Sequence, residues 1–266
     1  MTPLSLKRDI SAGVSSSDVD ISFFVACYNE EENIVGTFEM LLSSLAEVPV
    51  KWEILVIDDA SLDNSVEVIE RFIAAYPNLP LYLKENTINR GLGPNYVDGA
   101  FLTVGKYYRL ICGDNVELKE NLVTLLKCLG QADMIVPYPV EITGRSLFRR
   151  LLSNSFTRMV NALSGYRIKY YNGLAVHLRY NVMRWHGNYH GFGFQADLIT
   201  RLLDEGATYV EVPVIARERV AGKSKAMTLT NFLSVAHFFL DLCIRQIGRR
   251  FFPHYKLRTK VSPRQT

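Results

Sequence analysis

The residues best placed to do chemistry are two adjacent carboxylates, Asp58 and Asp59, which follow an apolar run. The run Ile54–Ile57 is typical of a parallel strand that is buried on both faces. Ligands of open α/β sheets bind at the carboxyl ends of such strands, so acids at this point favour a ligand-binding role. Capping of the next turn is the alternative, although one acid would suffice for a cap. Ser61 and Asp63 then predict the start of a helix.

Two other predicted strands also end in polar turns. Ile21–Ala26 is followed by Cys27–Glu30 and then a predicted helix, and Tyr107–Ile111 is followed by a turn that contains Asp114 and Asn115. The Asp114 carboxylate and the Asn115 amide oxygen are ligands that magnesium and manganese prefer. An ordinary turn is the alternative for this last segment, because Gly, Asp and Asn are all frequent in turns.

The alternation of strands and helices predicts an α/β fold with a mostly parallel sheet flanked by helices. The segment Asn89–Gly93 directly precedes a further predicted helix, Pro94–Val104. This position makes its glycines a stronger indication of a functional loop than glycines in an ordinary surface loop. No G-x-G-x-x-G motif follows the first strand, and this argues against a dinucleotide cofactor.

Composition indicates a single soluble α/β domain. The chain has 266 residues, is 48% hydrophobic and carries a formal net charge of +3, so it can bury a large core. The small charge and the lack of a nucleic-acid motif argue against nucleic acid as a partner. Four cysteines without a C-x-x-C pair argue against zinc and against disulfides, and they favour a reduced cytosolic protein.

The two ends of the chain differ from its centre. Residues 1–20 are polar and serine-rich, so we expect a disordered tail that is neither a signal peptide nor a membrane span. Residues 21–226 form the predicted catalytic domain, and residues 227–266 an amphipathic helix with a basic tail. Apolar residues recur at helical spacing in Met227–Ile247, but charged residues interrupt them, so no bilayer span is predicted. The basic and aromatic segment Arg245–Phe252 suits an anionic membrane interface; packing on the domain or on a membrane-protein partner subunit is the alternative.

Taken in order, these motifs resemble those of glycosyltransferase family 2, which has the GT-A fold, over about Ile21–Lys225. Within that family they particularly resemble the dolichyl-phosphate mannose synthases and their bacterial polyprenyl-phosphate relatives. The matching segments are Ala26–Ile34 (ACYNEEENI), Asp58–Asp63 (DDASLD), Asn89–Gly93 (NRGLG), Phe194–Leu198 (FQADL), Glu211–Val214 (EVPV) and Arg219–Lys225 (RVAGKSK).

The resemblance implies a nucleoside-diphosphate sugar, a UDP- or GDP-hexose, as the donor. It implies Mg²⁺ or Mn²⁺ held by Asp114 and Asn115, which would neutralise charge on the departing diphosphate and make Asp114 catalytic. The family's D-x-D motif falls on Cys112-Gly113-Asp114, so its first carboxylate is missing, and a catalytically inactive scaffold stays open as an alternative. The residues implied to contact the donor are Tyr28, Asn29, Glu30, Asp58, Asp59, Asn89, Gly91 and Asp114.

The resemblance places Gln195 where relatives that glycosylate a hydroxyl carry their general base. Glutamine cannot accept a proton, whereas a phosphate acceptor is already an anion and needs no base. Gln195 therefore favours a lipid phosphate, and Asp197 is the alternative base if the acceptor is a hydroxyl of a lipopolysaccharide or capsule glycan. An ordinary amphipathic helix, Phe194–Leu203, accounts for both residues without any catalytic role.

Basic residues complete the implied acceptor site, because fixed cations suit phosphate oxygens. The residues implied to bind the acceptor phosphate are Arg149, Arg150, Arg219, Lys223, Ser224 and Lys225, with Arg219 also in a catalytic role. Two arginines of the family pattern are replaced, by the segment Pro137–Pro139 and by Val176. The implied activity is inverting transfer of a hexose to a polyprenyl phosphate by a peripheral protein on the cytoplasmic face of a membrane.

Overall fold

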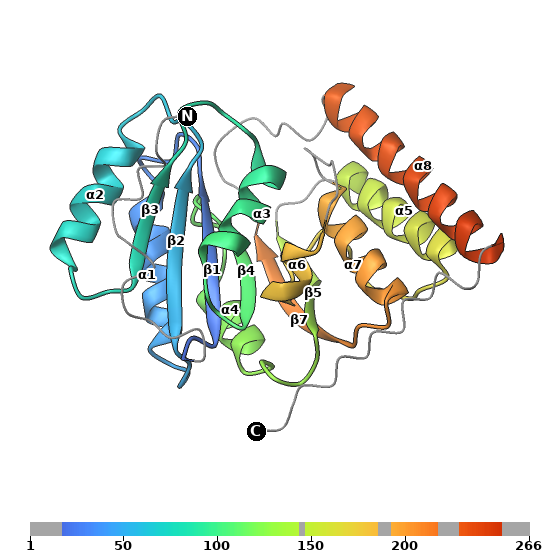
Figure 1. Ribbon diagram of the computed structural model, residues 1–266, viewed down its shortest axis with the longest axis horizontal. Coiled ribbons are helices and arrows are strands. Elements are labelled where there is room, and N and C mark those ends of the chain that lie inside the picture. Colours follow the sequence, from blue (N-terminus) through green and yellow to red (C-terminus); the bar gives the residue numbers. More distant parts are fainter. Residues whose placement is uncertain (1–17, 144–146, 186–192, 218–228, 252–266) are drawn as a thin grey trace.

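The protein is described here from a computed structural model that covers residues 18–143, 147–185, 193–217 and 229–251. Its centre is a seven-stranded sheet with the order β3-β2-β1-β4-β6-β5-β7 (Figure 1). The strands pair in parallel except for β6, which runs antiparallel to both of its neighbours. Their bounds are β1 Ile21–Cys27, β2 Trp52–Asp58, β3 Leu81–Glu85, β4 Tyr107–Cys112, β5 Met134–Thr143, β6 Val176–Leu178 and β7 Tyr209–Arg217. The predicted mostly parallel α/β sheet is confirmed.

Helices cover both faces of the sheet, because the central strands bury apolar side chains on both sides. Phe24, Leu55 and Leu110 point into the core under α3 and α7, whereas Phe23, Ile54 and Ile111 point into the core under α1, α2 and α4. The helices are α1 Ile34–Leu45, α2 Ser65–Ala75, α3 Leu92–Leu102, α4 Lys119–Leu126, α5 Leu147–Ser164, α6 Arg179–Met183, α7 Phe194–Asp204 and α8 Leu229–Phe251.

The helices α5, α7 and α8 lie together at the end of the molecule opposite α1 and α2 (Figure 1). An aromatic cluster joins α5 to α8: the ring of Phe156 lies 5.8 Å from that of Phe238 and 5.5 Å from that of Phe239. The predicted C-terminal amphipathic helix is therefore present, and it packs along α5 as well as on α7. Within the described ranges, none of the helices combines the length and the apolarity needed to cross a bilayer.

The start of the described structure differs from the predicted tail boundary, and the prolines of one strand have a local explanation. The described structure begins at Asp18, and Asp20 is already tied to Lys51 through a backbone hydrogen bond of 2.8 Å, whereas residues 1–17 lie outside the described residues. Strand β5 runs through Pro137 and Pro139, which lack the N–H that a central strand needs. It can do so because β6 pairs only with Met134 and Ile135, which leaves the later residues of β5 without a ladder partner on that side.

Candidate active site

Three polar turns lie side by side because three parallel strands end at the same edge of the sheet. Cys27 of β1 is in register with Asp58 of β2, and Ala26 is in register with Cys112 of β4. Backbone hydrogen bonds extend this pairing into the turns: Asp59 N–H donates to the Cys27 carbonyl, and Gly113 N–H to the Ala26 carbonyl, each at 2.9 Å. The turns that follow β1, β2 and β4 therefore form one continuous edge, as their positions in the sequence predict.

The Asp58 carboxylate organises the first two turns. It is buried and accepts hydrogen bonds from the backbone N–H of Ser61 at 2.9 Å and from its hydroxyl at 2.5 Å. The Ser61 hydroxyl in turn accepts the N–H of Asn29, and the Asn29 side-chain oxygen accepts the N–H of Leu62 at 2.7 Å. Asn29 and Ala60 have φ of 57° and 63°, a strained backbone region for alanine that this network holds in place.

The Asp59 carboxylate holds the loop that leads into α3. It accepts the N–H groups of Arg90 at 2.9 Å and Gly91 at 2.8 Å, together with the side-chain amide of Asn86 at 2.8 Å. Burial raises the pKa of Asp59, but these hydrogen bonds outweigh burial and leave the pKa below its ordinary value. Gly91 has φ of +80°, which favours glycine at this position. Asp59 is therefore an ionised clamp that joins the end of β2 to the loop Asn86–Gly91.

The other predicted donor residues lie on the same edge. Glu30 accepts a hydrogen bond from the Asn33 amide at 2.8 Å, and its own N–H donates to Ser65 at 2.9 Å. Tyr28 is half-buried between the turns, and Asn89 is exposed on the loop that Asp59 holds. The structure thus brings Tyr28, Glu30 and Asn89 to one side of the sheet, where the β1, β2 and β3 strands end.

Asp114 lines a cavity of about 300 Å³ towards the ends of β4, β5 and β7. Cys112, two residues earlier, lines the same cavity. The cavity is also lined by Pro137, Pro139 and Gly173, and the first two belong to the segment that replaces an arginine in the resemblance described above. Asp114 is therefore exposed to a space large enough for part of a small-molecule ligand.

Asn115, the second predicted metal ligand, is positioned differently. Its side-chain amide lies directly over the Cα of Gly36 in α1, where a larger residue would collide with it. Its N–H donates to the Thr37 hydroxyl at 3.0 Å, and its φ of 53° is left-handed. In this structure Asn115 anchors the turn after β4 to α1. Among the described residues, no cluster of three or more His, Cys, Asp and Glu side chains could hold a metal by itself, so a cation at Asp114 would need oxygens from its ligand.

Gln195 is buried in the first turn of α7 and faces the core. Its side-chain oxygen lies 3.4 Å from His177 Nε2, and Tyr96 lies close by on α3. Burial lowers the pKa of His177 to about 4, so this histidine is neutral near pH 7. Gln195 therefore lies in a neutral polar cluster inside the domain.

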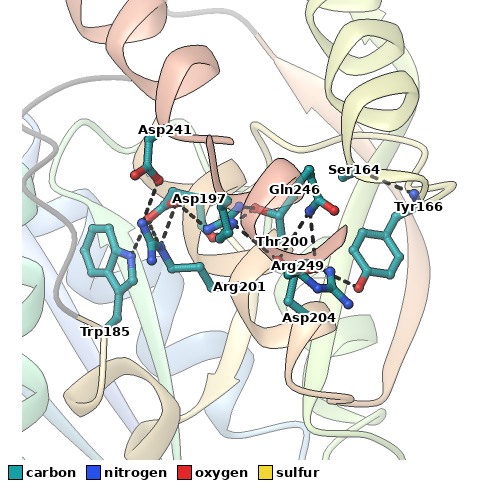
Figure 2. A network of polar contacts seen from close by, with 11 residues as sticks. Ser164, Tyr166, Trp185, Asp197, Thr200, Arg201, Asp204, Asp241, Gln246 and Arg249 are labelled. Carbon is teal, nitrogen blue, oxygen red and sulfur yellow. Dashed lines mark hydrogen bonds and ion pairs between the residues drawn. The ribbon is translucent and has the colours of Figure 1, made fainter. Parts of the chain in front are cut away.

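Asp197 is fully buried and bonded on every side (Figure 2). Its carboxylate accepts the Trp185 indole N–H at 2.7 Å, and it accepts Arg201 Nε at 2.9 and 2.8 Å. Arg245 of α8 adds a contact of 3.0 Å from Nη1. Arg201 also reaches Asp241 of α8 at 2.7 Å. This carboxylate is held in an ion-pair network, a position that disfavours proton transfer to a substrate.

A second acid of α7 extends this network (Figure 2). Asp204 forms ion pairs with Arg245 and Arg249, and it accepts the Tyr166 hydroxyl at 2.9 Å. Two acids of α7, spaced seven residues apart, therefore bind three side chains of α8, namely Arg245, Gln246 and Arg249. The sequence pattern contains the charges, but their pairing over forty or more residues was not predicted.

The predicted acceptor residues are only partly described. Arg149 and Arg150 lie in the first turn of α5, which begins four residues after β5 ends at Thr143. They therefore follow the carboxyl end of β5 in the chain. The other four predicted acceptor residues, Arg219, Lys223, Ser224 and Lys225, lie outside the described residues.

Comparison with known proteins identifies the family that this chain matches. The pattern described as "Glycosyl transferase family 2" matches residues 22–186. The chain is 24% identical over 227 residues to an undecaprenyl-phosphate 4-deoxy-4-formamido-L-arabinose transferase of Pectobacterium atrosepticum, a match that covers 84% of this chain and 66% of that protein. It is 26% identical over 131 residues to a dolichyl-phosphate beta-glucosyltransferase of Trichomonas vaginalis, covering 45% and 40%. The chain thus spans less than two-thirds of the length of each relative.

Solved structures agree on the fold. The chain superposes on glucosyl-3-phosphoglycerate synthase from Mycobacterium tuberculosis, solved with Mn²⁺, uridine diphosphate and phosphoglyceric acid, with a TM-score of 0.66. The two share 16% identity, and the match covers 86% of this chain and 80% of the other. At that identity the likeness establishes a GT-A fold, which confirms the predicted fold class.

Proposed function

Because the chain belongs to glycosyltransferase family 2, we propose that it transfers a hexose from a nucleoside-diphosphate sugar to a polyprenyl phosphate, with inversion. The two relatives named above are enzymes whose names specify a polyprenyl or dolichyl phosphate, and they support this acceptor class. The donor edge supports the nucleotide sugar, since Asp59 in the turn after β2 binds the loop Asn86–Gly91 at the edge that also carries the turns after β1 and β4.

One observation carries the choice of a phosphate acceptor. Gln195 cannot accept a proton, and the carboxylate of Asp197 is fully buried between Trp185, Arg201 and Arg245. A hydroxyl acceptor needs a base within hydrogen-bond reach, whereas a phosphate oxygen attacks as an anion. The arrangement on α7 therefore fits an acceptor that brings its own negative charge.

The reaction follows from these roles. An oxygen of the lipid phosphate attacks the anomeric carbon of the hexose from the face opposite the diphosphate, and the bond from that carbon to the diphosphate oxygen breaks. Asp114, from the turn after β4, would hold a divalent cation together with diphosphate oxygens. Such a cation, Mg²⁺ or Mn²⁺, supplies Lewis-acid neutralisation of the leaving group. Arg149 and Arg150 would attract the lipid phosphate to the edge where Asp114 lies.

The test is a donor panel of UDP- and GDP-hexoses incubated with polyprenyl phosphate or with a purified lipid-linked glycan, and products identified by mass spectrometry. We expect a hexosyl phospholipid, and its yield should fall by at least about 10²-fold in an Asp114→Ala variant if the cation acts as proposed. A product formed only on the glycan hydroxyl would contradict the acceptor. Absence of nucleotide binding under every metal condition would favour the inactive scaffold that the missing carboxylate at Cys112 suggests.

Membrane association is the second part of the proposal, and α5 supports it. The helix buries Val160 and three small polar residues, Ser153, Thr157 and Ser164, while Leu151 is 67% exposed. The exposed side of the helix is thus richer in apolar residues than is usual for an amphipathic helix, in which most apolar residues face the core. Its exposed apolar residues are Leu147, Phe148, Leu151, Leu152, Met159 and Leu163.

Helix α8 lies beside α5 (Figure 1) and also exposes apolar residues. Leu233, Leu240, Ile244, Ile247 and Phe251 are exposed at spacings of seven, four, three and four residues, which places them on one helix face. Arg150 and Arg158 of α5 and Arg250 of α8 are the charges that anionic lipid headgroups attract. We place this two-helix surface on the cytoplasmic face of a membrane, where a polyprenyl phosphate presents its headgroup.

Flotation with vesicles tests the surface. Leu151→Glu and Leu240→Glu should each weaken binding to vesicles of phosphatidylcholine and phosphatidylglycerol by about 10-fold, because each removes the burial of one leucine. Phe101→Glu is the matched control, since Phe101 is 57% exposed at the end of α3, away from α5 and α8. Equal binding by all three variants would contradict the membrane surface.

A further inference from the structure

One charged side chain of the central sheet has no role in the proposal so far. Arg109 lies in the middle of β4, between apolar neighbours on both sides, and it is 1% exposed. Its Nη2 forms an ion pair of 2.9 Å with Glu117, and its Nε donates to the Leu174 carbonyl at 3.2 Å. The remaining nitrogen, Nη1, is buried and has no hydrogen-bond partner among the described residues.

A buried guanidinium with an unused donor is costly, because its desolvation is not fully compensated. Such a group is expected where a ligand supplies the missing acceptor. Arg109 lines the 300 Å³ cavity at the ends of β4, β5 and β7, together with Glu117, Asp114 and Asn172. The residue that keeps an unused donor therefore also lines this cavity.

The charges in the cavity select the kind of ligand. Arg109 contributes one positive charge, whereas Glu117 and Asp114 contribute two negative charges. With Asp114 engaged by a cation, the Arg109–Glu117 pair is neutral and offers donors and acceptors side by side. A neutral group with several hydroxyls satisfies both members of such a pair, whereas a second anion would be repelled by Glu117.

We propose that the Arg109–Glu117 pair binds the hexose hydroxyls of the donor and determines which hexose is accepted. The assignment rests on the proposed function, in which Asp114 meets the diphosphate. The hexose is bonded directly to that diphosphate, so it must lie next to Asp114, and the cavity does. Its volume is at the lower end of small-molecule sites, which suits a single sugar ring.

The test compares nucleotide sugars with the matching nucleoside diphosphates. Dissociation constants of UDP, GDP, UDP-glucose, UDP-galactose and GDP-mannose are measured by calorimetry with Mn²⁺ for the wild type, Glu117→Gln and Arg109→Lys. Glu117→Gln preserves shape and removes the charge, and Arg109→Lys keeps the charge and removes the planar fork. Arg179→Lys is the matched control, because Arg179 is a partly buried arginine that donates to the Gly105 and Ala100 carbonyls elsewhere.

We expect both site variants to bind the preferred nucleotide sugar about 10-fold to 100-fold more weakly, as the loss of hydrogen bonds to charged groups implies. Binding of the nucleoside diphosphate alone should stay within about twofold, and the preference between glucose and galactose should shrink. If Arg109→Lys does not fold, Glu117→Gln decides by the same comparison. Parallel losses for sugar and nucleotide, or no loss, would overturn the assignment while the transferase proposal stands. No nucleotide binding by the wild type would overturn both.

Discussion

A substitution at Asp197 can distinguish two roles for this residue, a structural anchor and a general base. In the structure this fully buried carboxylate accepts hydrogen bonds from Trp185, Arg201 and Arg245. Asp197→Asn keeps the size of the side chain and the indole contact but removes the negative charge. Arg245→Gln is the matched variant, because it removes the cation that α8 contributes and leaves the carboxylate in place.

The expected loss of stability follows from the partners that remain. Breaking a buried ion pair costs about 3–5 kcal/mol when one charge is left alone. In Asp197→Asn, Arg201 still forms its ion pair with Asp241, and Arg245 still forms its ion pair with Asp204. We therefore expect a loss at the lower end of this range, about 3 kcal/mol. For a chain of this size that loss lowers Tm by about 6–12 °C. Because typical stabilities are about 5–15 kcal/mol, both variants should remain folded at 25 °C.

The measurement pairs calorimetric unfolding with the rate of transfer to polyprenyl phosphate at 25 °C. As an anchor, Asp197 predicts similar falls in Tm for Asp197→Asn and Arg245→Gln, and rates that stay within a few-fold of each other. A general base predicts a loss of about 10²–10⁴-fold in rate for Asp197→Asn alone. An Asp197→Asn variant with unchanged Tm and a rate reduced by that factor would refute the anchor.

Three further results are expected. Asp59→Asn should weaken nucleotide binding at least about 10-fold in calorimetry, because the clamp on Arg90 and Gly91 is a charge-assisted one; unchanged affinity would contradict its role in shaping the donor edge. Cys112→Asp should strengthen Mn²⁺-dependent nucleotide binding about 10-fold by adding a second carboxylate beside Asp114, and no gain would count against a cation at this turn. Burial lowers the pKa of His177 from 6.5 to about 4. Between these two pH values the imidazole binds a proton in the unfolded chain but stays neutral in the folded chain. The free energy of unfolding should therefore fall between pH 6.5 and pH 4, by up to about 3 kcal/mol from this residue, and chemical denaturation of His177→Gln over the same range should lack that part of the slope.

The donor edge could be predicted from the sequence because its logic is local. Each apolar strand ends in a polar turn, and parallel strands bring those turns to one edge whatever the details of packing. The register of Cys27 with Asp58 and of Ala26 with Cys112 confirms that the three turns meet. The hydrogen-bond partner of each acid is harder to predict from the sequence. Asp59 is satisfied by backbone groups 31 and 32 residues away, and only the placement of the loop before α3 reveals that.

The acceptor side could not be predicted to the same degree, because its contacts depend on tertiary packing. Asp197 is an acid in the first turn of an amphipathic helix, a pattern equally typical of a base and of an anchor. Its partner Arg245 lies 48 residues further along the chain. The sequence around Arg109 contains a signal for a special site, because an arginine inside the apolar strand YYRLIC is rarely tolerated unless it is paired. A charged residue at such a position indicates a buried ion pair or a ligand.

The network around Asp197 has a consequence for how the two halves of the proposed reaction meet. Helix α7 carries Gln195 beside the core of the domain, and the same helix grips α8 through Asp197 and Asp204. Because α8 also carries part of the exposed apolar surface, ion pairs join the helix that we propose to face the membrane to the helix that we propose to lie at the acceptor. We therefore expect the orientation of the domain on a bilayer to be fixed, with the edge that carries Asp114 held at a constant height above the lipid headgroups. Loosening Arg245 should then disturb transfer to a lipid embedded in vesicles more than transfer to a short, water-soluble polyprenyl phosphate.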